Sequence, residues 1–189
     1  FEDMLDKVQR AGLNAVEIGT GGNPGNHHCP TDELLESEEK RAAYLDELKK
    51  RNLTISAFSC HSNPISPDPV EAKASDEILR KTIRLAALMG VPVVNTFSGT
   101  AGDSEEATAP NWPVIPWPEV YTDIYKWQWE NKLIPYWKEI GEMASEYGVK
   151  IGIELHGGFL CHTPYTLLKL RENTCDAIGV NLDPSHLWW

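Results

Sequence analysis

Short apolar runs alternate with longer amphipathic stretches along this chain of 189 residues. Runs rich in valine, isoleucine and other apolar residues predict strands that are buried on both faces, as parallel strands covered by helices are. We place these strands at residues 15–19, 54–60, 91–97, 150–155 and 177–182. The regular return of such runs already indicates a parallel sheet.

The stretches between the runs have the spacing of amphipathic helices. They predict helices over 31–51, 70–89, 118–147 and 165–172, and a further helical pattern precedes Gly12. Gly90 and Gly148 follow two of these helices in the position of a C-terminal cap. Pro135 lies inside the third and predicts a kink or a split there. Alternating strands and helices are typical of βα units around a parallel sheet.

Repeated βα units favour a (β/α)8 barrel, which commonly takes about 250 residues, more than this chain has. We therefore expect residues 1–189 to form a single incomplete barrel domain with about five strand/helix units. The first strand and the last units would lie outside the sequence. A complete doubly wound sheet is the alternative, but no helix directly follows the glycine-rich segment 19–22, which therefore matches the expected fingerprint loosely.

Composition and charge narrow the class of protein. A hydrophobic content of 41% supports a substantial core, and the formal net charge of −11 disfavours nucleic acid as a partner. No apolar run is long enough to span a membrane, and residues 1–4 lack the features of a signal peptide. A cytoplasmic location is the resulting expectation. The cysteines form no C-x-x-C pair and are expected to be reduced: Cys29, Cys60, Cys161 and Cys175.

Acidic and imidazole side chains end the last two predicted strands. Glu154 closes one apolar run, and Asp183 and His186 follow the next. The site of a parallel barrel lies at the carboxyl ends of its strands, so we expect these side chains to converge. A carboxylate that ends an apolar run carries a desolvation cost, which a divalent cation or a catalytic role would offset. The alternative is a helix cap, which Asp183 could form before Pro184.

Two further histidines follow predicted strands. His61 comes after the second strand, where a role in the site and a role in the loop scaffold are equally compatible with the sequence. His156 lies two residues after Glu154 and would project to the same face of an extended chain. Glu17 lies within its strand, which favours a buried structural acceptor.

Tryptophans lie in the long connection over residues 98–117 and in the helix that follows. Connections of this length are usually functional, and we expect Trp112 and Trp117 to wall a sugar pocket. Trp127, Trp129 and Trp137 have helical spacing and are expected in the core. Glu, Asp and His ligands with open positions suit Mn²⁺, Mg²⁺ or Co²⁺, and the absence of thiolate spacing argues against structural zinc.

Several segments resemble the xylose isomerase-like superfamily of sugar phosphate isomerases and epimerases. They are VEIG at 16–19, SCHSNP at 59–64, WQWE at 127–130, IPYW at 134–137, ELHGG at 154–158 and NLDPSH at 181–186. The resemblance implies a barrel whose divalent metal is held by a Glu, an Asp, a His and a second Glu on successive strands. Glu154 and Asp183 match the first two ligands, and the others would fall beyond Trp189.

The resemblance also implies roles and a reaction. Glu154 would be both metal ligand and general base, and a proton would move through an enediolate intermediate. His186 would contact or polarise the substrate, and His61 and His156 would line the pocket. Mn²⁺ is the expected cofactor, with Mg²⁺, Co²⁺ and Zn²⁺ as alternatives. With half of the ligand set outside the sequence, this chain alone is expected to be inactive.

Two other functions remain open at this point. The apurinic endonuclease branch of the superfamily cleaves phosphodiesters with a zinc cluster, and His61 matches one of its imidazoles, but the strand ending at Phe97 offers no other. A non-catalytic sugar-binding barrel is the second alternative. The expected partner is a small sugar or polyol, without nucleic acid or membrane, and a homo-oligomer is left open.

Overall fold

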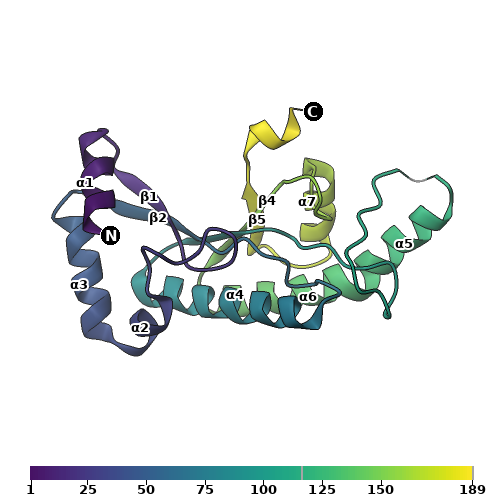
Figure 1. The fold of residues 1–189 in the computed structure, drawn as a ribbon, viewed down its shortest axis with the longest axis horizontal. Coiled ribbons are helices and arrows are strands. Elements are labelled where there is room, and N and C mark those ends of the chain that lie inside the picture. Colours follow the sequence, from purple (N-terminus) through teal and green to yellow (C-terminus); the bar gives the residue numbers. More distant parts are fainter. Residues whose placement is uncertain (116, 189) are drawn as a thin grey trace.

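Five parallel strands form one sheet whose spatial order follows the chain (Figure 1). In the computed structural model, which describes residues 1–115 and 117–188, each strand pairs in parallel with the next. The strands are β1 (Ala15–Gly19), β2 (Thr54–Ser59), β3 (Val93–Thr96), β4 (Lys150–Glu154) and β5 (Ile178–Asn181). Because consecutive strands are neighbours and helices connect them, the architecture is that of a (β/α) barrel.

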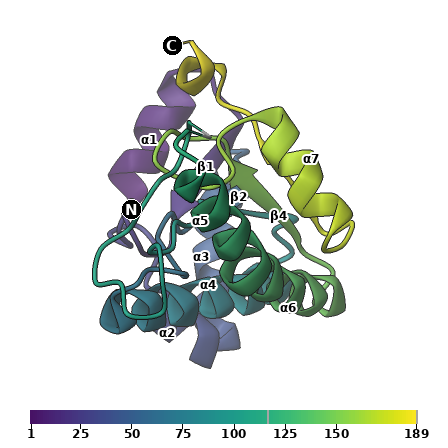
Figure 2. The same ribbon diagram turned by 90° about the vertical axis from the view of Figure 1, so that its right-hand side faces the viewer.

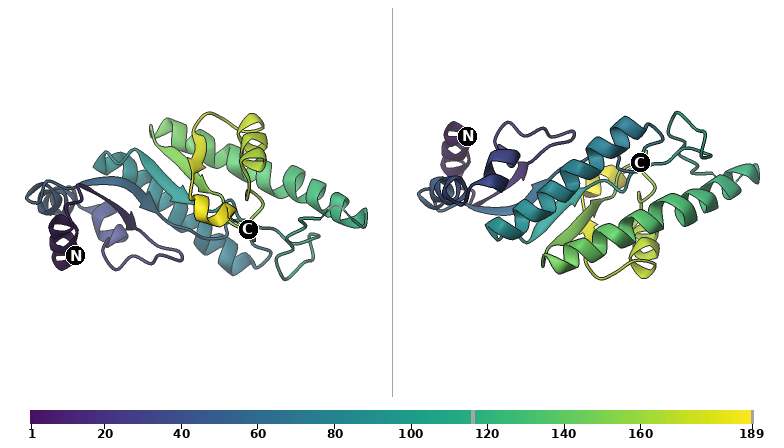
Figure 3. Two further views of the ribbon diagram at one scale, coloured as in Figure 1. Left: turned by 90° about the horizontal axis from the view of Figure 1, so that it is seen from above. Right: turned by 90° about the horizontal axis from the view of Figure 1, so that it is seen from below.

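Helices connect the strands and cover one face of the sheet. They are α1 (Glu2–Arg10), α2 (Thr31–Glu36), α3 (Glu38–Lys49), α4 (Pro69–Met89), α5 (Val120–Gln128), α6 (Ile134–Glu146) and α7 (Pro164–Glu172), with a π-helix η1 (Trp129–Leu133) and a 3-10 helix η2 (Pro184–Leu187). Helices α4 and α6 run side by side beneath the strands, and η2 lies on the opposite side (Figure 3). Helix α7 packs beside β5.

The core lies between this face of the sheet and its helices. Val94 and Ile151 of the central strands and Ile83 and Ile140 of the covering helices are fully buried. Trp129 and Trp137 are also buried, as their spacing predicted, whereas Trp127 is half-buried. Burial of apolar surface between the two layers is the main stabilising contribution to such a fold.

The predicted helix over 31–51 is two helices, because Ser37 interrupts it. Ser37 has an extended backbone, with φ −126° and ψ 117°, and its side chain accepts a hydrogen bond from the amide of Lys40 at 3.2 Å. A serine in this position satisfies an amide that the first turn of a helix leaves unpaired. The apolar spacing continues across the break and conceals it in the sequence.

The predicted helix over 118–147 is split, as the position of Pro135 suggested. Pro135 lies in the first turn of α6, where a missing amide hydrogen costs little. The π-helix η1 directly precedes it and carries the change in hydrogen-bond register between α5 and α6. The three segments follow one another along one direction (Figure 2).

The sheet is open, so the fold is a partial barrel. Within the described residues, the outer edges of β1 and β5 have no strand partner. All four cysteines are free thiols, as expected. None of the described helices combines the length and the apolar character that crossing a lipid bilayer requires.

Candidate metal centre and active site

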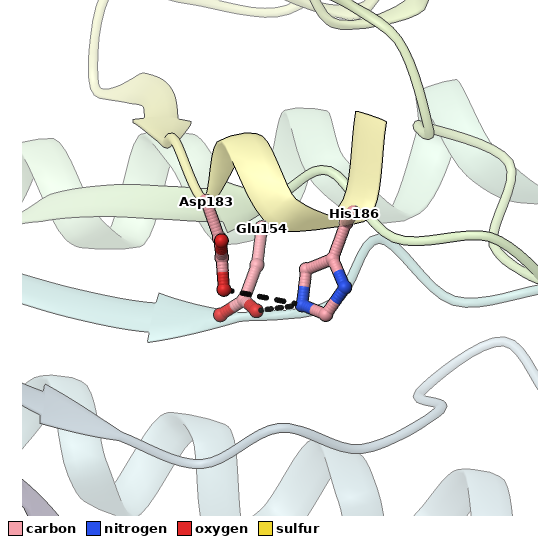
Figure 4. A group of neighbouring side chains, drawn as sticks. All are labelled: Glu154, Asp183 and His186. Carbon is pink, nitrogen blue, oxygen red and sulfur yellow. Dashed lines mark hydrogen bonds and ion pairs between the residues drawn. The ribbon is translucent and has the colours of Figure 1, made fainter. Parts of the chain in front are cut away.

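The ends of β4 and β5 bring together three of the predicted site residues. Glu154 is the last residue of β4, and its partner in the register is Asn181, the last residue of β5. Asp183 follows two residues later as the N-cap of η2, which carries His186. Because parallel strands end at the same edge of the sheet, these side chains meet above it (Figure 4).

Glu154, Asp183 and His186 each direct one ligand atom to a common point. These atoms all lie within 4.8 Å of one another. Nε2 of His186 is 3.0 Å from Oε1 of Glu154 and 3.4 Å from Oδ2 of Asp183 (Figure 4). Two carboxylates and one imidazole form a donor set that suits a divalent cation. The convergence expected from the strand ends is therefore present.

Asp183 also forms the cap that the sequence offered as an alternative. Its Oδ1 accepts a hydrogen bond from the amide of Ser185 at 2.9 Å, while Oδ2 faces His186. Hydrogen bonds from Ser185 lower the pKa of Asp183 below its usual value, and the nearby His186 and His156 act in the same direction. One carboxylate thus supplies both a cap and a charged oxygen to the cluster.

The two oxygens of Glu154 have different partners. Oε2 lies 2.8 Å from Nε2 of His61 and accepts a hydrogen bond from Nδ2 of Asn181, also at 2.8 Å. Oε1 faces His186. An ionised carboxylate only accepts hydrogen bonds, so the contact with His61 requires the proton on Nε2 of that ring.

Aromatic rings surround the cluster on one side. The ring of His61 meets Phe97 edge-on, with centroids 4.5 Å apart, and the ring of His156 lies 4.3 Å from that of His186. Phe97 also stacks on Phe159 at 4.1 Å. His61 and His156, which the sequence placed in the pocket, both lie at the cluster.

The two loop tryptophans lie farther out. Nε1 of Trp112 donates a hydrogen bond to the carbonyl of Phe159 at 2.9 Å, so Trp112 connects to the cluster through aromatic residues. Trp117 is 78% exposed and lines a cavity of about 430 Å³ together with Trp112 and Tyr121. The structure does not bring Trp117 against the cluster, and the role of both residues stays a prediction.

Two residues at the site were not singled out from the sequence. Asn181 is a polar residue near the end of an apolar strand, and its register with Glu154 would have identified it once the strand pairing was known. Phe97 carries no such signal. Glu17 accepts a hydrogen bond from Nδ2 of Asn95 at 2.9 Å, but it is exposed rather than buried as expected. Its side chain lies on the opposite face of β1 from its buried neighbours Val16 and Ile18.

Residues 5–189 match the sequence profile of the family described as xylose isomerase-like TIM barrel. A curated relative, the uncharacterized protein YfiH of Bacillus subtilis (strain 168), is 41% identical over 192 residues. The alignment covers 100% of this chain and 61% of that relative. The chain therefore spans less than two thirds of the relative's length.

Solved structures of the family have the same fold. A D-psicose 3-epimerase crystallised in the presence of D-fructose has a TM-score of 0.63 and 16% identity, over 99% of this chain and 59% of that chain. A xylose isomerase-like TIM barrel protein from Mycobacterium smegmatis, in complex with magnesium, has a TM-score of 0.62 and 17% identity, over 98% and 56%. On the sequence profile and this shared fold, the chain belongs to the xylose isomerase-like TIM barrel family.

Proposed function

We propose that this protein is a divalent-metal-dependent isomerase or epimerase of a sugar or sugar phosphate, which moves a proton beside a carbonyl through an enediolate. The observation that carries the proposal is the convergence of Glu154, Asp183 and His186 within 4.8 Å at adjacent strand ends. The family and the sugar epimerase among its similar structures support this reaction class.

The donor atoms that would hold the cation are the ones that face each other in the cluster: Oε1 of Glu154, Oδ2 of Asp183 and Nε2 of His186. Mn²⁺ is the cation we expect, with Mg²⁺, Co²⁺ and Zn²⁺ as alternatives, because the set combines hard carboxylate oxygens with one imidazole. Such a cation would polarise the substrate's carbonyl and offset the negative charge that develops on its oxygen. His186 would need its Nε2 deprotonated to serve as a ligand.

Glu154 would act as the general base. Its Oε2 is already engaged by His61 and Asn181, so Oε1 would serve both roles. One lone pair of Oε1 would face the cation, and the other would accept the proton from the carbon beside the carbonyl. The Glu154 side chain is 15% exposed. Few water molecules can therefore compete with the substrate for this carboxylate. His186 would orient or polarise the substrate oxygen next to it.

An aromatic wall would receive the sugar. His156, Phe97 and Phe159 pack against one another beside the cluster. Aromatic faces pack well on the apolar faces of sugar rings and add contact area at little cost in conformational entropy. His61 and His156 would line this pocket, and Trp112 would support it from behind through Phe159.

The phosphodiesterase alternative is less well supported. A zinc cluster would need a second imidazole at the end of β3, and the ring of Phe97 follows that strand and contacts His61 instead. A net charge of −11 also opposes the approach of a phosphate backbone. The sugar-binding alternative differs from the enzyme only in turnover, which the following experiment measures.

Deuterium exchange tests the proposal directly. The full-length protein is incubated with Mn²⁺ and a panel of ketoses in D₂O, and deuterium incorporation at the carbon beside the carbonyl is followed by NMR. We expect exchange with at least one ketose, and a fall of about 10²- to 10⁴-fold in Glu154→Gln, since general-base catalysis contributes about that much. Glu172→Gln, at the exposed end of α7, is the matched control and should exchange at the wild-type rate. Bound Mn²⁺ without exchange of any ketose would contradict the proposal.

A further inference from the structure

We propose that Asn181 is a positioning residue that, together with His61, fixes Oε2 of Glu154 and so selects Oε1 as the reactive oxygen. This inference rests on the proposed function, in which Glu154 is base and ligand. Without such a constraint the carboxylate could turn about its last bond and exchange its two oxygens, since this torsion is broad and roughly two-fold. A base and ligand needs one defined oxygen.

Two donors hold Oε2 from opposite sides. Asn181 ends β5, the neighbour of β4 on one side, and its Nδ2 donates to Oε2 at 2.8 Å. His61 follows β2, two strands away on the other side, and its Nε2 contacts the same oxygen at 2.8 Å. Because the donors come from separate strand ends, the orientation of the carboxylate is set by the sheet.

Burial makes these two contacts hard to replace. The side chains of Glu154 and His61 are only 15% and 11% exposed. A water molecule cannot readily take the place of a lost donor in such surroundings, and hydrogen bonds to a charged acceptor are stronger than those between neutral groups. The loss of either donor should therefore loosen the carboxylate.

A second amide on the same face has a different partner. Asn95 donates from Nδ2 to Oε2 of Glu17 at 2.9 Å. Gly152 lies between the two amides, and a Cβ there would be 2.3 Å from Oδ1 of Asn95 and 3.5 Å from Cβ of Asn181. Glycine at this position leaves room for both. Asn181 is thus the described asparagine whose amide contacts Glu154.

Calorimetric titration of the full-length protein with Mn²⁺ measures metal affinity, and this readout of how firmly Glu154 is held does not depend on turnover. Asn181→Leu keeps a side chain of similar shape but removes the donor, and we expect its Mn²⁺ affinity to fall about 10- to 100-fold, the usual effect of losing a group that orients a ligand. Asn173→Leu is the matched control, because Nδ2 of Asn173 donates to the carbonyl of Lys169 on exposed α7. Asn181→Ala serves as a second variant, and circular dichroism checks that each variant folds.

A double-mutant cycle tests whether the two donors act on one oxygen. His61→Phe keeps a ring that packs on Phe97 but loses the donor. If both residues fix Oε2, the combined variant should lose less than the product of the two single losses, because residues that share a partner are not additive. In the exchange assay, Asn181→Leu should lower kcat more than it raises KM, since the substrate does not contact Asn181 in this proposal.

The outcomes separate this inference from the proposed function. Wild-type affinity and kcat in folded Asn181→Leu, or fully additive losses in the cycle, would overturn the role of Asn181 and leave the reaction standing. Mn²⁺ binding by the wild type without exchange of any ketose would overturn the reaction, and the Mn²⁺ affinity of Asn181→Leu would still decide the positioning role. Full-length wild-type protein that binds no Mn²⁺ would overturn both.

Discussion

Two glycines that face each other across β4 and β5 have very different surroundings. A Cβ on Gly152 would lie 2.3 Å from Oδ1 of Asn95, whereas a Cβ on its register partner Gly179 would meet only the carbonyl of Ile151 at 3.7 Å. The first distance is a clash and the second is ordinary contact. Residues in the same row of the sheet therefore differ sharply in the side chains they tolerate.

Substituting these glycines gives a matched pair of variants. Gly152→Ala should lower the free energy of unfolding by about 1–3 kcal/mol, because overpacking displaces Asn95. Gly179→Ala should change it by about 0.5 kcal/mol or less. Urea unfolding monitored by tryptophan fluorescence measures both values. Equal stability of the two variants would show that Asn95 has room to move.

The raised pKa values of the buried thiols predict how the free energy of unfolding depends on pH. Burial raises the pKa of Cys60 to about 12 and that of Cys29 to about 11, against an ordinary value of 9.0. Below pH 9 both states hold the proton and the thiols contribute their full stability. As the pH rises from 9 toward 12, the unfolded chain deprotonates first and stability is lost. Unfolding free energies from pH 8 to 10.5 should fall less steeply in Cys60→Ala than in the wild type, and an unchanged slope would contradict this.

The sequence predicted that Glu154, Asp183 and His186 converge, because polar residues at the carboxyl ends of neighbouring parallel strands meet. It could not identify the contact between His61 and Glu154, which are 93 residues apart and joined only by the sheet. The same limit hid Asn181, whose partner depends on strand register rather than on its own neighbours in the chain.

At the scale of elements, one buried glutamine contacts three backbone carbonyls of the long connection between β3 and α5. Nε2 of Gln128 lies within hydrogen-bonding distance of the carbonyls of Ala101, Gly102 and Asn111, at 3.1, 2.8 and 2.7 Å. Gln128 is fully buried. The segment that carries Trp112 is therefore tied to the C-terminal end of α5.

Removing this glutamine should release the connection. Gln128→Leu removes the side-chain donor from the carbonyls of Gly102 and Asn111, whereas that of Ala101 keeps the amide of Asn111. A buried carbonyl left without a donor costs about 1–3 kcal/mol. We expect faster cleavage within residues 98–119 in limited proteolysis, read by mass spectrometry. Gln9→Leu, which removes an exposed glutamine bonded to the carbonyl of Arg51, is the control. Wild-type cleavage rates in Gln128→Leu would mean that other contacts hold the segment.

The periodicity of the sequence located the helices but not all of their interruptions. Pro135 marked one split, since proline has a known effect on the amide pattern of a helix. Ser37 gave no comparable signal, because serine is common on helix surfaces and becomes a cap only through its backbone conformation. Nothing in the composition of residues 129–133 predicted the π-helix η1.

At the scale of the whole molecule, β5 and the residue that follows it present an edge with exposed apolar side chains. Val180 and Leu182 are 46% and 58% exposed, and within the described residues β5 pairs only with β4. An exposed, apolar strand edge is a template for pairing with another chain.

The order of the strands was predictable because short right-handed crossovers place consecutive strands side by side. Which surfaces remain exposed followed only from the structure.

This edge predicts self-association of the purified chain. Light scattering coupled to size-exclusion chromatography should give a mass that rises with concentration, and Val180→Lys should reduce the rise by placing a charge on the edge. Val70→Lys changes another exposed valine, 76% exposed at the start of α4, and should leave association unchanged. A constant monomer mass in the wild type, or equal effects of the two variants, would refute the prediction.

Asp183 both caps the short helix η2 and belongs to the charged cluster, so the local fold of η2 determines the geometry of the proposed ligands. This helix sets the distance from Asp183 to His186. Inserting or deleting one residue between them would rotate the imidazole away while leaving every strand intact. We therefore expect related proteins that keep the cluster to have no insertion or deletion between Asp183 and His186.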